Sequence, residues 1–117
     1  MIKGVGVDLV DLARFESKLT ETPALVERIF TPSERDRSMQ SLAGVWASKE
    51  ALIKAIGNPS GLNWHDVTVA KDSLGKPHLE LSGATKDRAD QMGITSWHLS
   101  ISHDGGMACA FVIAEGN

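Results

Sequence analysis

Four side chains in this sequence could perform chemistry together: Asp8, Glu50, Lys54 and His103. They come from three separated stretches, and in each stretch glycine, alanine or serine lies beside the charged or imidazole group. Two isolated carboxylates suit a hard cation such as Mg²⁺, which takes few protein oxygens and fills its shell with phosphate and water. Nearby lysines suit phosphate oxygens. The pattern therefore favours phosphoryl-type chemistry on a phosphorylated small molecule.

Each of these residues also has a purely structural interpretation. Glu50 and Lys54 are spaced as an i,i+4 surface pair, worth only a few tenths of a kcal/mol. Asp8 follows a strand-like segment and could cap the next helix, although Asp11 competes for that role. A single histidine is often structural. The Ser102-His103-Asp104 run is not a hydrolase triad, because adjacent residues cannot adopt that geometry.

One long helix, expected over residues 41–56 and ended by Gly57, must position the Glu50–Lys54 pair. Lys49 lies within the apolar stripe of this helix and must either reach out to solvent or meet an anion. Ala43 and Ala47 flank the charged pair, so we expect room there for a ligand to approach. The stripe itself consists of Leu42, Val45, Trp46, Leu52, Ile53 and Ile56.

The rest of the chain predicts an α+β fold, with a mainly antiparallel sheet packed against the long helix. The first strand carries glycines where side chains would obstruct neighbouring backbone. A capping box in Thr31-Pro32-Ser33-Glu34 predicts a helix over residues 32–39. The other expected elements are strands over residues 1–9, 67–70, 78–81, 97–102 and 107–114, helices over 12–19, 22–29 and 82–92, the last capped by Ser82, and a loop over 58–61.

Composition limits the class of protein. The 117 residues suit one domain over 1–117, and a net charge of −3 argues against nucleic acid as a partner. The single Cys109 cannot form an internal disulfide and suits the core. The sequence has no long apolar span, so we expect no membrane association and a cytoplasmic location. A domain of this size encloses a large ligand poorly, which leaves oligomerisation open.

Two motifs resemble the signatures of the 4′-phosphopantetheinyl transferase superfamily: Val5-Gly6-Val7-Asp8 and the run from Trp46 to Lys54. Further stretches, in the right order across nearly the whole chain, resemble its short bacterial type, the holo-acyl-carrier-protein synthases. These are Gly6-Val7-Asp8-Leu9-Val10 with Arg14, Phe30-Thr31 with Glu34, Gly75-Lys76-Pro77, and Ser100-Ile101-Ser102-His103-Asp104 with Ala108 and Ala110.

The resemblance implies the fold of that superfamily and transfer of the 4′-phosphopantetheine arm of coenzyme A to a serine of apo-acyl carrier protein. Adenosine 3′,5′-bisphosphate would be released, and fatty acid biosynthesis would be served. Asp8 and Glu50 would be the Mg²⁺ ligands, and Lys54 would contact phosphate. Glu50 or a metal-bound water would take the serine proton, and the sequence does not choose between them. It also leaves open whether Lys54 acts as a base or only binds phosphate.

The resemblance also implies binding roles for residues outside the metal site. The expected coenzyme A contacts are Lys49, Lys54, Gly57, Pro77, His103 and Asp104. Arg14 and Lys18 on the first helix would dock the acidic carrier protein. Val45 departs from the pattern, because many relatives have arginine there to help bind coenzyme A phosphate.

The short members are typically homotrimers with active sites at subunit interfaces. We therefore expect the strand carrying Asp8 from one subunit to meet the helix carrying Glu50 from another. Two other functions stay open. A non-catalytic module would bind coenzyme A or the carrier without turnover, and a metal-dependent phosphohydrolase would release product with no carrier present.

Overall fold

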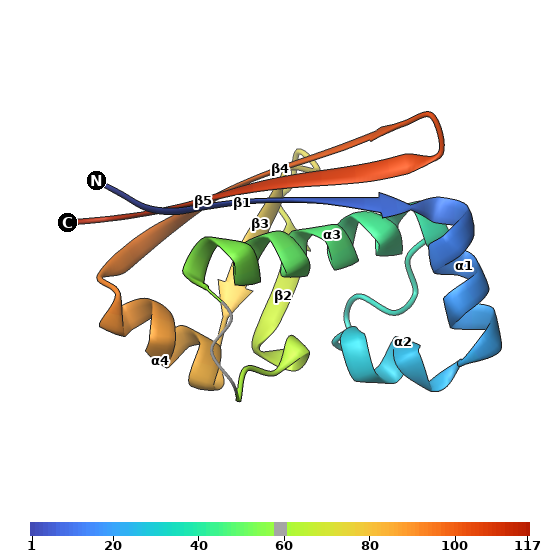
Figure 1. Ribbon diagram of the computed structural model, residues 1–117, viewed down its shortest axis with the longest axis horizontal. Coiled ribbons are helices and arrows are strands. Elements are labelled where there is room, and N and C mark those ends of the chain that lie inside the picture. The colour runs from blue at the N-terminus through green and yellow to red at the C-terminus, as the bar shows by residue number, and fades with distance from the viewer. Residues whose placement is uncertain (58–60) are drawn as a thin grey trace.

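A computed structural model of the chain describes residues 1–57 and 61–117 (Figure 1). Residues 58–60 of the expected loop lie outside the described part. In chain order the elements are β1 (Ile2–Asp11), α1 (Leu12–Glu21), α2 (Ala24–Ile29), α3 (Met39–Ile56), the 3₁₀ turn η1 (Trp64–Asp66), β2 (Val67–Lys71), β3 (Pro77–Leu81), α4 (Gly83–Gln91), β4 (Ile94–Asp104) and β5 (Met107–Gly116).

The strands form two antiparallel sheets, which confirms the α+β prediction. One sheet has the order β1-β5-β4, and the other pairs β2 with β3. The first and last strands of the chain are therefore hydrogen-bonded neighbours, and Figure 1 shows the two termini side by side. None of the described helices is both long enough and apolar enough to span a membrane.

Helix α3 lies along one face of the three-stranded sheet and is the centre of the fold (Figure 1). Its alanines recur every four residues, at 43, 47, 51 and 55, and all are buried. They allow β1 to approach closely: a Cβ added at Gly6 would lie 1.8 Å from the Ala51 carbonyl oxygen, and one at Gly4 would lie 1.9 Å from that of Ala55. The prediction that the strand glycines avoid obstruction is confirmed. The prediction of open space beside Ala43 and Ala47 is wrong, because both residues are fully buried.

The two faces of β1 have different roles because successive side chains alternate across a strand. Gly6 and Val10 are buried on the α3 side, whereas Val5, Val7 and Leu9 are exposed. On the neighbouring strand β5 the alternation repeats: Ala108, Ala110, Val112 and Ala114 are fully buried, and Phe111 is exposed. The sheet therefore presents an outer apolar face, formed by Val5, Val7, Leu9 and Phe111, that the described residues leave exposed.

The helix predicted over residues 32–39 is wrong. Glu34 does reach back to the Thr31 amide at 2.8 Å, as a capping box requires, but only isolated turns follow. The other carboxylate oxygen of Glu34 accepts a 2.7 Å hydrogen bond from the Val69 amide, which fixes this turn against β2. Ser38 then starts α3 in extended conformation, and its side chain accepts from the Ser41 amide. The turn is therefore held by tertiary contacts that interrupt helical propagation.

Of three other helix ends, two are capped as predicted and one, the start of α4, is not. Asp11 caps α1 by accepting from the Arg14 amide, which leaves Asp8 available for another role, as the sequence suggested. Ser82 makes no side-chain cap at α4; instead Asp66 accepts from the Thr85 amide and hydroxyl. Gly57 ends α3 with φ of 81°, a conformation that favours glycine, as predicted.

Candidate active site

Asp8 lies on the α3 side of β1, near the carboxyl end of the strand, opposite Ala110 of β5. Its side chain is 16% exposed, and its Oδ1 atom lies 3.0 Å from the Lys54 ammonium. Lys54 Nζ also donates to the Val7 carbonyl at 3.1 Å. Residues 46 positions apart thus meet across the β1–α3 contact that the strand glycines allow.

Glu50 lies one turn before Lys54 on α3 and is half-buried. Burial raises the pKa of the Glu50 carboxyl above its ordinary value, and the nearby negative charge of Asp8 raises it further. Lys54 acts in the opposite direction but more weakly. Two like charges held close together in a partly desolvated place attract a cation, and this arrangement is typical of functional carboxylates.

Asp8 and Glu50 line one cleft, which we call the carboxylate cleft, with a volume of about 350 Å³. Two exposed cations of α1, Arg14 and Lys18, line the same cleft, and Trp46 forms part of its wall. The complete lining is Asp8, Leu9, Val10, Asp11, Arg14, Phe15, Lys18, Trp46 and Glu50. Negative charge within the cleft and positive charge from α1 suit a cation bound inside and an acidic partner outside.

A second cleft of about 300 Å³, the His103 cleft, lies beside the N-terminal half of α3. His103 Nε2 lies 2.9 Å from the Gln40 carbonyl oxygen, and the ring reaches this place because residue 44 is glycine: a Cβ there would lie 3.2 Å from Nε2. Arg37 and Lys71 also line the cleft. The remaining lining residues are Ser38, Gln40, Ser41, Gly44, Val45, Val69, Gly75, Pro77 and Ile101.

Within residues 1–57 and 61–117 the two clefts share no lining residue, so one chain does not place all the predicted contacts together. His103 and Pro77 line one cleft, whereas Asp8 and Glu50 line the other. Among the residues that the structure describes, Gly57 and Asp104 line neither of these clefts. The expectation that Asp8 and the Glu50 helix meet only across a subunit interface is corrected, because both carboxylates lie in one cleft of the same chain.

The expected contact of Lys49 with a coenzyme A phosphate is also corrected. The Lys49 side chain is 0% exposed, and its ammonium lies 2.8 Å from Oε1 of Glu34, itself 0% exposed. Burial lowers the pKa of Lys49, and Glu34 opposes that effect. Lys49 therefore meets an anion inside the protein instead of reaching out.

Sequence reasoning missed two residues that shape the site. Glu34 was interpreted as a helix cap and as part of a family motif, but not as the partner of Lys49, although a lysine in an apolar stripe that does not reach solvent needs an anion. Arg37 lines the His103 cleft, and its Nη1 atom is buried without a hydrogen-bond partner in the described structure. No local pattern marks Arg37, because its place follows from its 2.7 Å hydrogen bond to the Val69 carbonyl, 32 residues away.

Comparison with known proteins agrees with this architecture. The family model of the 4′-phosphopantetheinyl transferase superfamily matches residues 4–112. A holo-[acyl-carrier-protein] synthase of Beutenbergia cavernae is 53% identical over 115 residues, covering 98% of this chain and 99% of the relative.

Two solved structures have the same fold. The holo-[acyl-carrier-protein] synthase of Neisseria meningitidis superposes with a TM-score of 0.89 at 31% identity, covering 98% of this chain and 99% of that one. The enzyme of Helicobacter pylori, solved in complex with coenzyme A, gives a TM-score of 0.83 at 35% identity, covering 95% and 99%. With sequence, fold and site pattern in agreement over nearly its whole length, the chain belongs to the 4′-phosphopantetheinyl transferase superfamily.

Proposed function

We propose that this protein transfers the 4′-phosphopantetheine group of coenzyme A to a serine of apo-acyl carrier protein and releases adenosine 3′,5′-bisphosphate. The observation that carries the proposal is the carboxylate cleft. It combines Asp8, Glu50 and the neighbouring Lys54 with Arg14 and Lys18 of α1, within a chain whose relatives are named holo-[acyl-carrier-protein] synthases. Carboxylates that can hold a metal ion, a lysine for phosphate and a cationic helix suit phosphoryl-type transfer to an acidic protein.

The carboxylate cleft has the donors for Mg²⁺. Asp8 and Glu50 would hold the ion, and among the described residues no three Asp, Glu, His or Cys side chains are grouped so that they could hold a metal ion together. Two carboxylates leave most of an octahedral shell to substrate phosphate and water, which is the usual arrangement for Mg²⁺. When bound, the ion would polarise the pyrophosphate and offset charge that develops on the leaving phosphate.

The protein's own groups would position the reactants. Lys54 is 54% exposed and lies at 3.0 Å from Asp8, so its ammonium can turn to a phosphate oxygen as substrate enters. The serine proton must be accepted by Glu50 or by a water beside it. Burial and the charge of Asp8 raise the pKa of Glu50, which makes its carboxylate a stronger base than an exposed one.

The adenosine bisphosphate end of coenzyme A needs a cationic cleft of its own. Arg37 and Lys71 supply positive charge in the His103 cleft, and His103 adds an imidazole. Pro77 and Val45 form part of its wall. Gly57 and Asp104 would make further contacts with coenzyme A, whereas the buried Lys49 would make none. Since the two clefts are separate within one chain, we propose that the His103 cleft of one copy completes the carboxylate cleft of another in a homotrimer. The outer apolar face supports such an assembly.

Mass spectrometry tests the reaction directly. The purified protein is incubated with coenzyme A, Mg²⁺ and apo-acyl carrier protein at low ionic strength, which preserves electrostatic steering. The expected result is a carrier heavier by one phosphopantetheine group. Coenzyme A bound without turnover would instead support a binding module. Product released in the absence of carrier would support a phosphohydrolase, and either result would reject the proposed transfer.

A further inference from the structure

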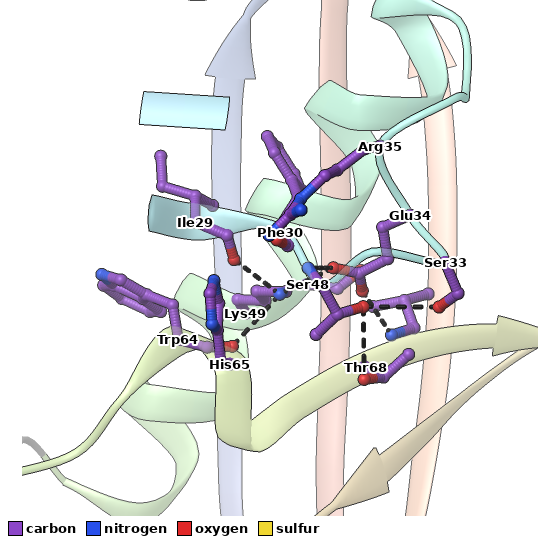
Figure 2. Close-up of polar contacts among 12 residues, drawn as sticks. Ile29, Phe30, Ser33, Glu34, Arg35, Ser48, Lys49, Trp64, His65 and Thr68 are labelled. Carbon is purple, nitrogen blue, oxygen red and sulfur yellow. Dashed lines mark hydrogen bonds and ion pairs between the residues drawn. The ribbon is translucent and has the colours of Figure 1, made fainter. Parts of the chain in front are cut away.

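Lys49 and Glu34 form a buried ion pair next to Glu50 in the sequence of α3 (Figure 2). The ammonium of Lys49 and the carboxylate of Glu34 are 2.8 Å apart, and both side chains are 0% exposed. Lys49 immediately precedes Glu50 on α3. Because consecutive helical residues point about 100° apart, Lys49 can point into the protein while Glu50 faces the cleft.

The ion pair is fully satisfied by hydrogen bonds. Besides Glu34, the Lys49 ammonium donates to the carbonyls of Ile29 and Trp64, at 2.8 and 3.1 Å, so all three of its protons have acceptors. Glu34 also accepts from the amides of Thr31 and Val69. Lys49 and Glu34 thus tie α3 to the end of α2, to the turn after it, to η1 and to β2.

Two aromatic contacts connect this ion pair to the wall of the cleft. The Lys49 ammonium lies 5.7 Å from the centre of the Phe30 ring, which packs edge-to-face on Phe15 at 6.2 Å. The backbone carbonyl of Trp64 accepts a hydrogen bond from Lys49, and the Trp64 ring packs on the Trp46 ring with the ring centres 4.8 Å apart. Phe15 and Trp46 both line the carboxylate cleft. A displacement of Lys49 would therefore be transmitted to the cleft through its walls as well as through α3.

Stability alone explains this ion pair poorly, because apolar residues of similar volume are often as stabilising as a buried pair of charges. The pair does fix one rotation and one axial position of α3, since its hydrogen bonds are directional. We propose that Lys49 and Glu34 are positioning residues, which hold α3 so that the Glu50 carboxylate meets Asp8 in the carboxylate cleft. This inference rests on the proposed function for the role of that cleft.

The main test is the double variant Lys49→Met/Glu34→Gln. It removes both charges together and leaves an amide oxygen to accept from Thr31 or Val69, so no charge is buried alone. The matched control is Lys86→Met/Asp90→Asn, which removes an exposed ion pair of α4. Three properties are measured: the melting temperature, kcat with the KM for coenzyme A, and Mn²⁺ binding by electron paramagnetic resonance, which requires no turnover.

We expect the double variant to fold, to keep its KM for coenzyme A within about twofold, and to lose roughly 10- to 100-fold in kcat and in Mn²⁺ affinity, the range seen when groups that orient metal ligands are removed. The control should match the wild type. A folded double variant with wild-type kcat and Mn²⁺ affinity would overturn the proposal and leave a structural role only.

A second variant decides the matter if the double variant does not fold. Glu34→Asp keeps every charge but shortens the acidic side chain by one methylene group. Either α3 must shift toward the carboxylate, or the hydrogen bond from Lys49 must lengthen. Mn²⁺ affinity should fall several-fold with a native circular dichroism spectrum, and unchanged affinity would reject the positioning role. Failure of the proposed function would be seen separately, as wild-type protein that binds Mn²⁺ but modifies no carrier.

Discussion

At the scale of single residues, Glu50 carries its charge at an unfavourable place. It is half-buried on α3, and Asp8 lies in the same cleft. Both effects raise the pKa of Glu50. A carboxyl with a raised pKa in the folded protein binds its proton more tightly there than in the unfolded chain. Stability therefore increases as pH falls through the raised pKa and is lower above it.

Glu50→Gln should lose activity and gain stability. Transfer should fall by more than about 100-fold, because removing even a group that orients a metal ligand costs 10- to 100-fold. In metal-free buffer at neutral pH the variant should melt above the wild type, since the unfavourable charge is gone. That difference should shrink as pH falls through the raised pKa of Glu50.

Thermal unfolding across a pH series measures the effect, with exposed Glu21→Gln as the control. An activity close to wild type would exclude Glu50 as a metal ligand. A melting temperature unchanged at neutral pH would show that the Glu50 charge is not held unfavourably.

At the scale of elements, the site depends on how closely β1 approaches α3. Gly6→Ala would place a methyl group 1.8 Å from the Ala51 carbonyl, and a backbone oxygen cannot rotate away. The strand must move, at a cost of about 3 kcal/mol in the free energy of unfolding, the upper part of the usual range for overpacking. Urea denaturation checks this value against Ser17→Ala on the exposed side of α1. A loss below about 1 kcal/mol would contradict the tight contact.

Helix α1 should govern the encounter with the carrier and not the chemistry. Arg14→Ala and Lys18→Ala should each raise the KM for the acyl carrier protein about two- to fivefold, as exposed charges contribute little individually. Their kcat should be unchanged, and the dependence of kcat/KM on salt should weaken. Steady-state kinetics at two ionic strengths measures both, with exposed Lys86→Ala of α4 as the control. An effect confined to kcat would argue against docking.

At the scale of the whole molecule, the separation of the two clefts predicts that an active site is shared between copies of the chain. If each active site takes its carboxylate cleft from one copy and its His103 cleft from another, Glu50→Gln and His103→Ala chains should complement each other. In mixed oligomers from equal amounts of the two chains, about a quarter of the sites would combine two intact clefts. Co-expressed, differently tagged chains would therefore recover roughly that fraction of wild-type transfer.

The control for complementation pairs Glu50→Gln with Asp8→Asn. Both changes lie in the carboxylate cleft, so no mixed site would be intact and no activity should return. A Glu50→Gln and His103→Ala mixture no more active than its two parents would refute a site shared between copies.

The sequence by itself determined the local geometry of this protein. Strand alternation placed Gly4, Gly6 and Asp8 on one face of β1, and helical periodicity placed Glu50 and Lys54 one turn apart. The hairpin of β2 and β3, the glycine end of α3 and the α+β class also followed from residue type and spacing. These features depend on a residue and its near neighbours, which is the information that a single sequence contains. The metal-binding role of Asp8 and Glu50 stays a prediction.

Only the tertiary structure decided which groups meet. Lys49 pairs with Glu34 instead of a ligand, and the turn around Glu34 is not a helix, because Val69 and Lys49 hold its carboxylate from distant segments. The four alanines of α3 are buried within the chain and not open to substrate, and at Ala51 and Ala55 the reason is that Gly6 and Gly4 admit the β1 backbone. The physical reason is the same in each case. The local sequence pattern determines the direction in which a side chain points, whereas long-range packing determines which residues it contacts.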